Sequence, residues 1–169
     1  MKMDKETAKK VLEIMLNADG GCEFCVRKLY LQFIKEFPQY SYLARKLYRE
    51  TFNQELVTED MAESIIKEVI NETLKAYNLE AEKIILFGSR ARGDHKKDSD
   101  WDILLVIKQE ITQQLKDELF KSITEKLSHY LIPCDLIIKS VEDLEFYKNF
   151  YGTVTYEALK EGHSLGYKE

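Results

Sequence analysis

Two acidic residues alternate with a tryptophan at the start of an apolar segment. Asp100 and Asp102 flank Trp101, and residues 103–107 are all apolar. Successive side chains of a β-strand point to opposite faces of a sheet, so both carboxylates are expected on one face and the tryptophan on the other. Carboxylates that share a small volume repel each other unless a cation lies between them, and Mg²⁺ prefers such oxygen ligands. The pattern therefore predicts a magnesium site formed by Asp100 and Asp102.

A glycine–serine pair precedes these carboxylates and has the features of a phosphate-binding turn. Gly88 follows the largely apolar segment 83–87, and ten residues separate Ser89 from Asp100. Glycine lets the backbone approach a phosphate closely, and Ser89 offers both a hydroxyl and an amide N–H. We therefore expect Gly88 and Ser89 to bind the phosphates of a nucleotide.

The segment between the pair and Asp100 is basic, whereas the whole chain has a formal net charge of -5. An acidic chain is not expected to bind nucleic acid through bulk charge. The basic residues of the segment are Arg90, Arg92, Lys96 and Lys97. Because the guanidinium group donates paired hydrogen bonds to phosphate oxygens, we expect Arg90 and Arg92 to bind a triphosphate. We interpret the two lysines and His95 as surface residues.

A third carboxylate, Asp135, lies in the apolar segment 134–138 that follows Pro133. If this segment pairs with the strand that carries Asp102, Asp135 reaches the same face. There it would share a metal ion or accept the proton of an attacking hydroxyl group. The alternative for Asp135 is a residue at the start of a strand that caps a turn after Pro133. For Gly88 and Ser89 with Asp100 and Asp102, the alternative is a tight turn followed by an exposed strand edge with solvated carboxylates.

Apolar periodicity places these residues in a protein with two regions. Helices are expected over residues 5–16, 22–37 and 40–52 and in a fourth segment that begins after Thr58. Strands are expected over residues 83–87, 101–107 and 134–138, with helical segments at 112–130 and 141–161. We therefore predict an N-terminal helical region, residues 1–78, and a domain at 79–169 of the α/β (α+β) class, with a small mixed β-sheet flanked by helices.

The three cysteines are Cys22, Cys25 and Cys134. The spacing of the first two is typical of half a zinc site, but no other ligands have a matching spacing, so we interpret them as semi-buried thiols. Neither an apolar run of about 18 residues nor the apolar stretch of an export signal is found, so we expect a cytoplasmic protein with reduced thiols.

The segment from Gly88 to Asp135 resembles the nucleotidyltransferase superfamily that includes DNA polymerase β, and within it the minimal nucleotidyltransferases. The shared pattern is an apolar strand, Gly-Ser, a spacer of about ten residues, Asp-x-Asp between apolar residues, and a later Asp on another strand. The matching residues are Gly88, Ser89, Asp100, Asp102 and Asp135, and the resemblance extends over residues 65–165.

This resemblance implies a nucleotidyltransferase fold, two Mg²⁺ ions and the transfer of a nucleoside monophosphate, expected to be AMP from ATP, to a hydroxyl group. It also implies catalytic and metal-binding roles for the three aspartates. Many such proteins are encoded beside a HEPN-family protein, and some act as antitoxins that adenylylate a tyrosine of that partner.

Two other functions remain open at the level of sequence. One is an aminoglycoside-type transferase, although few residues follow the second strand in which to build a further acceptor domain. The other is an antitoxin that neutralises its partner by binding alone. The residues do not determine the acceptor, the preferred base, the oligomeric state or the role of the N-terminal helices.

Overall fold

The computed structural model describes residues 3–96 and 99–165. The chain divides into two compact units, Met1–Thr58 and Glu59–Glu169. The boundary predicted after residue 78 lies two residues beyond the end of helix α4, Glu59–Ala76. In the structure α4 contacts α6, Gln113–His129, and strand β1, Ala81–Phe87, so this helix belongs to the second unit. None of the helices in the described ranges is long and apolar enough to cross a membrane.

The first unit contains three helices: α1 (Lys5–Asn17), α2 (Glu23–Glu36) and α3 (Ser41–Phe52). Short 3-10 turns at Ala18–Gly21 and Pro38–Tyr40 connect them.

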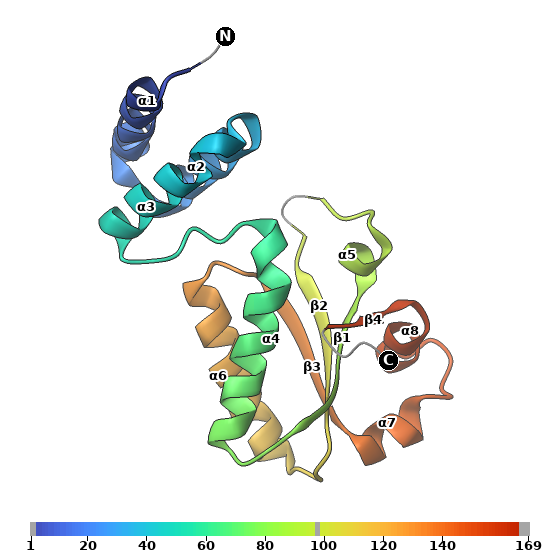
Figure 1. Cartoon of the computed structure of the whole chain (residues 1–169). Helices are drawn as coiled ribbons and strands as arrows, with labels where there is room; N and C mark the ends of the chain where they lie inside the picture. The colour runs from blue at the N-terminus through green and yellow to red at the C-terminus, as the bar shows by residue number, and fades with distance from the viewer. Residues whose placement is uncertain (1–2, 97–98, 166–169) are drawn as a thin grey trace. The chain divides into compact units, whose positions relative to one another are not determined.

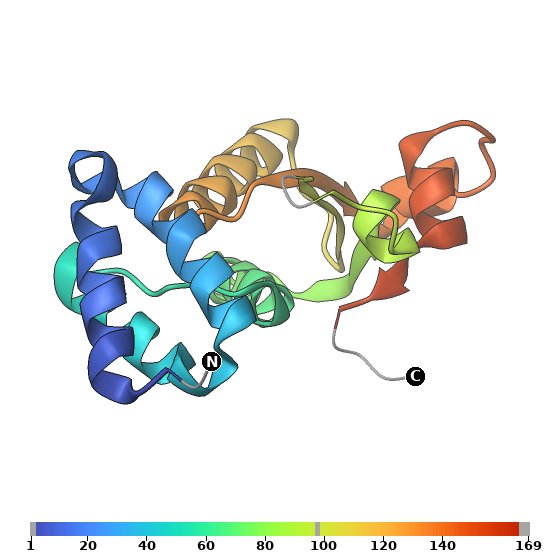
Figure 2. The same ribbon diagram turned by 90° about the horizontal axis from the view of Figure 1, so that it is seen from above.

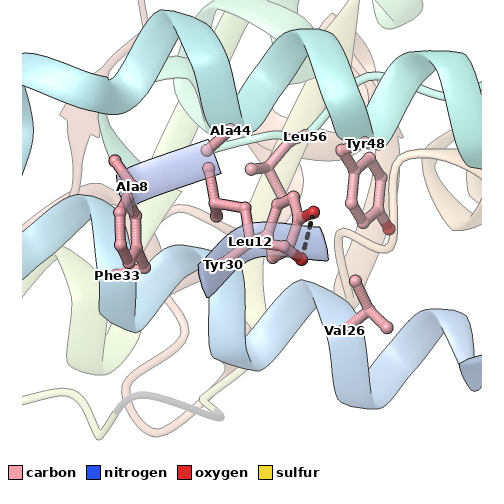
Figure 3. Packing of buried hydrophobic residues seen from close by; sticks show 8 residues of the cluster. All are labelled: Ala8, Leu12, Val26, Tyr30, Phe33, Ala44, Tyr48 and Leu56. Atoms are coloured by element: carbon pink, nitrogen blue, oxygen red, sulfur yellow. Dashed lines mark hydrogen bonds between the residues drawn. The ribbon is translucent and has the colours of Figure 1, made fainter. Parts of the chain in front are cut away.

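The three helices share one apolar core, shown in Figure 3. Its fully or nearly fully buried members are Ala8, Leu12, Val26, Tyr30, Phe33, Ala44, Tyr48 and Leu56. The hydroxyl of Tyr30 donates a buried hydrogen bond of 3.0 Å to the carbonyl of Leu12, so the one polar atom of this ring is satisfied within the core. The predicted helices of this region are therefore confirmed.

The second unit is built on a mixed sheet with the order β3-β2-β1-β4 (Figure 1). The remaining strands are β2 (Trp101–Ile107), β3 (Cys134–Ser140) and β4 (His163–Ser164). Strand β1 is antiparallel to both β2 and β4, whereas β2 and β3 are parallel. The predicted mixed sheet is confirmed, with β4 as an added short edge strand.

Helices cover both faces of this sheet, as Figures 1 and 2 show. Helices α4 and α6 pack together on one face, and α7 (Val141–Tyr147) and α8 (Val154–Glu161) contact the other. The side chains under α7 and α8 alternate along the strands, as expected for period two. They are Ile85, Phe87, Leu104 and Val106, which pack with Leu144 and Ala158.

The helical segment predicted over residues 141–161 is two helices in the structure. Gly152 has a φ of +78° between them, and the Thr153 hydroxyl caps α8 by accepting from the Tyr156 amide. Ser140 and Asp143 form a reciprocal capping box at the start of α7. A glycine followed by a capping threonine ends one helix and starts the next, so the break has a local cause.

Candidate active site

The register of three strands brings the predicted carboxylates to one end of the sheet. Asp102 is the partner of Phe87 on β1 and of Asp135 on β3. Residues that are partners across neighbouring strands point to the same face, so Asp102 and Asp135 are neighbours. Asp100 directly precedes β2 and is exposed. The three aspartates therefore lie beside the end of β1, where Gly88 begins.

The electrostatics of this end of the sheet reflect the proximity of the carboxylates. Burial raises the pKa of Asp102, and the charges of Asp135 and Asp100 raise it further, while Arg92 and Arg90 act in the opposite direction. Burial, followed by the same three carboxylates, raises the pKa of the Cys134 thiol to about 12. The thiol is therefore protonated at neutral pH, and the carboxylates share one region of negative potential.

Neighbouring carboxylates repel each other, and a divalent cation bound between their oxygen atoms relieves this repulsion. No set of three Asp, Glu, His or Cys side chains within residues 3–96 and 99–165 is already arranged to hold a metal ion. Mg²⁺ is commonly held by one or two carboxylates, with water and substrate phosphates completing its shell. The donor types at Asp100, Asp102 and Asp135 thus fit Mg²⁺ without forming a closed protein cage.

Gly88 forms the corner between β1 and the single helical turn α5, Gly88–Arg92. Its φ is +68°, and a Cβ at this position would collide with the Asp102 carboxylate. Both the left-handed backbone and the close approach of Asp102 require glycine here. Ser89 follows on α5 and is half-buried.

Glu161, at the end of α8, contacts the same corner and was not anticipated from the sequence. Its Oε1 accepts hydrogen bonds from the Gly88 amide at 3.0 Å and from Arg92 Nη1 at 2.8 Å. Arg92 Nε also donates to Asp94 Oδ2 at 3.3 Å. The hydrogen bonds to Glu161 and Asp94 raise the pKa of Arg92 above its usual value. Glu161 is 73 residues from Gly88 in the chain, so no local sequence signal links them.

Arg90 is nearly buried, with 7% of its side chain exposed, and it fastens the loop after α5. Its Nε and Nη2 donate to the Ser99 carbonyl at 3.1 and 2.8 Å, and Nη1 pairs with Glu59 at 2.5 Å. The guanidinium lies 4.3 Å from the centre of the Trp101 ring. These contacts compete with the phosphate-binding role predicted for Arg90, which stays a prediction.

Glu59, at the start of α4, is the second residue that sequence reasoning missed. The hydrogen bond from Arg90 holds the pKa of Glu59 below its usual value, and His95 Nε2 lies 2.9 Å from the same carboxylate. With Trp101, which is 6% exposed, these residues line a cavity of about 250 Å³. Trp101 therefore packs on the face opposite Asp102, as the alternation predicted.

The remaining candidate residues are not part of this arrangement. Lys97 lies outside the described residues, and Lys96 is exposed. In the first unit, Cys22 is exposed and Cys25 is half-buried.

Comparison with known proteins identifies the second unit. Residues 68–168 match the family described as "Polymerase beta, Nucleotidyltransferase". The chain belongs to this nucleotidyltransferase family. The match covers the carboxylates, the Gly88–Ser89 corner and Glu161, and the mixed sheet with helices on both faces is consistent with the fold of the family. The chain is therefore an enzyme of the nucleotidyltransferase class.

Two relatives of this nucleotidyltransferase come from Methanocaldococcus jannaschii, and each carries the name "Putative protein adenylyltransferase". One is 36% identical over 103 residues, which are 61% of this chain and 96% of the relative. The other is 32% identical over 77 residues, which are 46% of this chain and 74% of the relative. The similarity supports a minimal nucleotidyltransferase.

Proposed function

We propose that this nucleotidyltransferase transfers AMP from ATP to a hydroxyl group of a protein, with Mg²⁺ bound by Asp100 and Asp102. The observation that carries the proposal is the register of Asp102 with Asp135 on one side and with Phe87, the residue before the Gly88–Ser89 corner, on the other. Carboxylates and a phosphate-binding corner at one end of a sheet are what nucleotidyl transfer requires.

The chain's own groups have distinct parts in the proposed reaction. Gly88 and Ser89 bind the triphosphate, and Arg92 adds positive charge beside it. The oxygen of the acceptor hydroxyl group attacks the α-phosphorus of ATP. The bond between the α-phosphorus and the bridging oxygen of the pyrophosphate breaks, and pyrophosphate leaves. Bound Mg²⁺ would neutralise phosphate charge and polarise the α-phosphate.

We assign to Asp135 the role of the base that acts on the acceptor hydroxyl group. Asp135 is exposed, whereas its partner Asp102 is half-buried, so an incoming hydroxyl reaches Asp135 more easily. In the proposed reaction Asp135 accepts the hydroxyl proton as the new oxygen–phosphorus bond forms.

A protein acceptor is favoured by the names of the two relatives, which describe protein adenylyltransferases. We propose a HEPN-family RNase encoded beside this chain as the acceptor, in a toxin–antitoxin pair, because the sequence resembles minimal nucleotidyltransferases. In that case the AMP would be attached to a tyrosine of the partner.

The test is transfer of label from ATP labelled at the α-phosphate, with Mg²⁺ and a lysate of the source cells. Label is expected on a protein band, and none when the label is on the γ-phosphate or when a chelator is present. The Asp100→Asn, Asp102→Asn double variant should lose the transfer. Label on a small molecule would indicate an aminoglycoside-type acceptor, and transfer retained by the double variant would contradict the proposed site.

A further inference from the structure

We propose that Glu161 is a positioning residue for the nucleotide, which holds the Gly88 amide and the Arg92 guanidinium at the corner where the triphosphate binds. This inference rests on the proposed function, because it assigns a role within the same site. Glu161 is not expected to contact the reacting atoms, and it acts through Gly88 and Arg92.

The backbone around Glu161 is fixed by close packing. Gly162, the next residue, comes so near β1 that a Cβ would lie 2.5 Å from Ile85 Cγ2 and 2.9 Å from the Leu86 carbonyl. His163 then pairs with Leu86 in the sheet. Since α8 contacts β1 as well, Glu161 is held from both sides beside the end of that strand.

One carboxylate oxygen of Glu161 joins two separate parts of the corner. Oε1 accepts from the Gly88 amide at 3.0 Å and from Arg92 Nη1 at 2.8 Å, and 27% of the side chain is exposed. Hydrogen bonds to a charged acceptor are stronger than neutral ones. The carboxylate thus restrains both the backbone turn at Gly88 and the orientation of Arg92.

Arg92 connects this restraint to the carboxylate cluster. The positive charges of Arg92 and Arg90 oppose the rise in the pKa of Asp102, so Arg92 lies within electrostatic reach of the proposed metal-binding residue. Arg92 is otherwise half exposed, at 46% of its side chain. A long exposed side chain loses conformational freedom when it binds a ligand, and an existing anchor reduces that loss. Glu161 therefore preorganises the guanidinium for phosphate.

An alternative role for Glu161 is to occupy the phosphate-binding position in the free protein and to leave it when ATP binds. The hydrogen bonds at the Gly88–Ser89 corner are less consistent with this role. Glu161 accepts hydrogen bonds from the Gly88 amide and from Arg92, whereas the Ser89 hydroxyl makes no hydrogen bond with any residue in the described part of the chain. Ser89 therefore stays available for phosphate while Glu161 remains in place. The two roles predict opposite effects on ATP affinity when Glu161 is replaced.

The test compares Glu161→Gln and Glu161→Ala with Glu157→Gln as the control. Glu157 is on the same helix, is half-buried and has the same charge. Calorimetry with ATP and Mg²⁺ should show affinity weakened about tenfold in Glu161→Gln, the effect of one lost charge-assisted hydrogen bond, and more in Glu161→Ala. The rate constant kcat should stay within about twofold in Glu161→Gln, because the loss is one of binding. Unchanged or tighter ATP binding would overturn the proposal.

A second measurement does not depend on nucleotide. Hydrogen exchange of the Gly88 amide, followed by NMR in the free protein, should be slow in the wild type and in Glu157→Gln and faster in Glu161→Ala. Equal exchange in all three proteins would overturn the role at Gly88. Failure of the wild type to bind ATP would contradict the proposed function instead, and the exchange result would distinguish that case.

Discussion

Asp102 is a carboxylate that the fold holds at an electrostatic cost, at the proposed metal site. Burial and the neighbouring charges of Asp135 and Asp100 all disfavour its ionised form, and the two arginines oppose them only in part. A group of this kind does not stabilise the fold at neutral pH. Its presence near the start of β2 is consistent with the metal-binding role that we propose for it.

The first prediction concerns the stability of Asp102→Asn. The pKa of Asp102 is raised in the folded state, so its protonated form stabilises the fold at low pH. This contribution is lost as pH rises through the raised pKa. At pH 7 the neutral variant should therefore melt higher than the wild type, by no more than about 3 °C for a partly exposed group. The difference in melting temperature should vanish at a pH below the usual pKa of aspartate. In the same variant, transfer of label from ATP should fall by more than about 100-fold relative to the wild type.

The control for this prediction is Asp117→Asn on α6, where an exposed carboxylate accepts from Gln113 one turn away. It should leave transfer unchanged and show no gain in melting temperature at pH 7. A wild-type level of transfer in Asp102→Asn would remove this residue from the catalytic site.

The second prediction concerns Gly88→Ala, with Gly93→Ala as a matched control. Both glycines have a positive φ, +68° and +79°, but a Cβ at Gly93 would meet nothing within 4 Å. Gly93→Ala should cost about 1 kcal/mol of unfolding free energy from backbone strain alone. Gly88→Ala should cost more, about 2–4 kcal/mol, because the methyl group also displaces Asp102. Denaturant unfolding measures both, and equal costs would contradict the close approach of Asp102.

At the scale of elements, Arg90 ties α5, the start of α4 and the loop before β2 together. It donates to the Ser99 carbonyl twice, pairs with Glu59 and stacks on Trp101. A buried guanidinium with several partners has a fork geometry that an ammonium group does not reproduce. The arginine therefore has a structural role whether or not it also contacts phosphate.

The third prediction follows for Arg90→Lys, which keeps the charge and loses the fork. Its unfolding free energy should fall by about 1–3 kcal/mol, since hydrogen bonds to Ser99 are lost in a buried setting. Arg92→Lys, at a half-exposed position, should change stability by less than about 1 kcal/mol. Denaturant titration of both variants provides the measurement, and equal effects would show that Arg90 does not fasten the loop.

The pairing of Arg90 with Glu59 also gives stability a pH dependence. The pKa of Glu59 is held below its usual value by the hydrogen bond from Arg90. Its contribution is therefore present above the usual glutamate pKa of 4.5 and is lost as pH falls through the lower folded-state value. Glu59→Gln should show a weaker loss of stability between neutral and acid pH than the wild type.

At the scale of the whole molecule, sequence reasoning succeeded where local pattern carries the information. Strict alternation placed Asp102 and Trp101 on opposite faces, and the apolar segments predicted the strands β1, β2 and β3. Glu161 and Glu59 were missed because their partners, Gly88 and Arg90, are 73 and 31 residues away. Strand β4 was missed because its two residues, His163 and Ser164, are polar and exposed and become a strand only by pairing with β1.

The two units have separate cores, so damage to one core should remain within its unit. Leu12 is completely buried among the helices of the first unit, whereas Ile14 on the same helix is 70% exposed. Leu12→Ala should destabilise the first unit by about 2–5 kcal/mol, and Ile14→Ala should have little effect. Hydrogen exchange should then accelerate in α1–α3 and stay slow in β1 and β2. Equal acceleration in both units would mean that the chain unfolds as one cooperative body and that the N-terminal helices support the catalytic sheet.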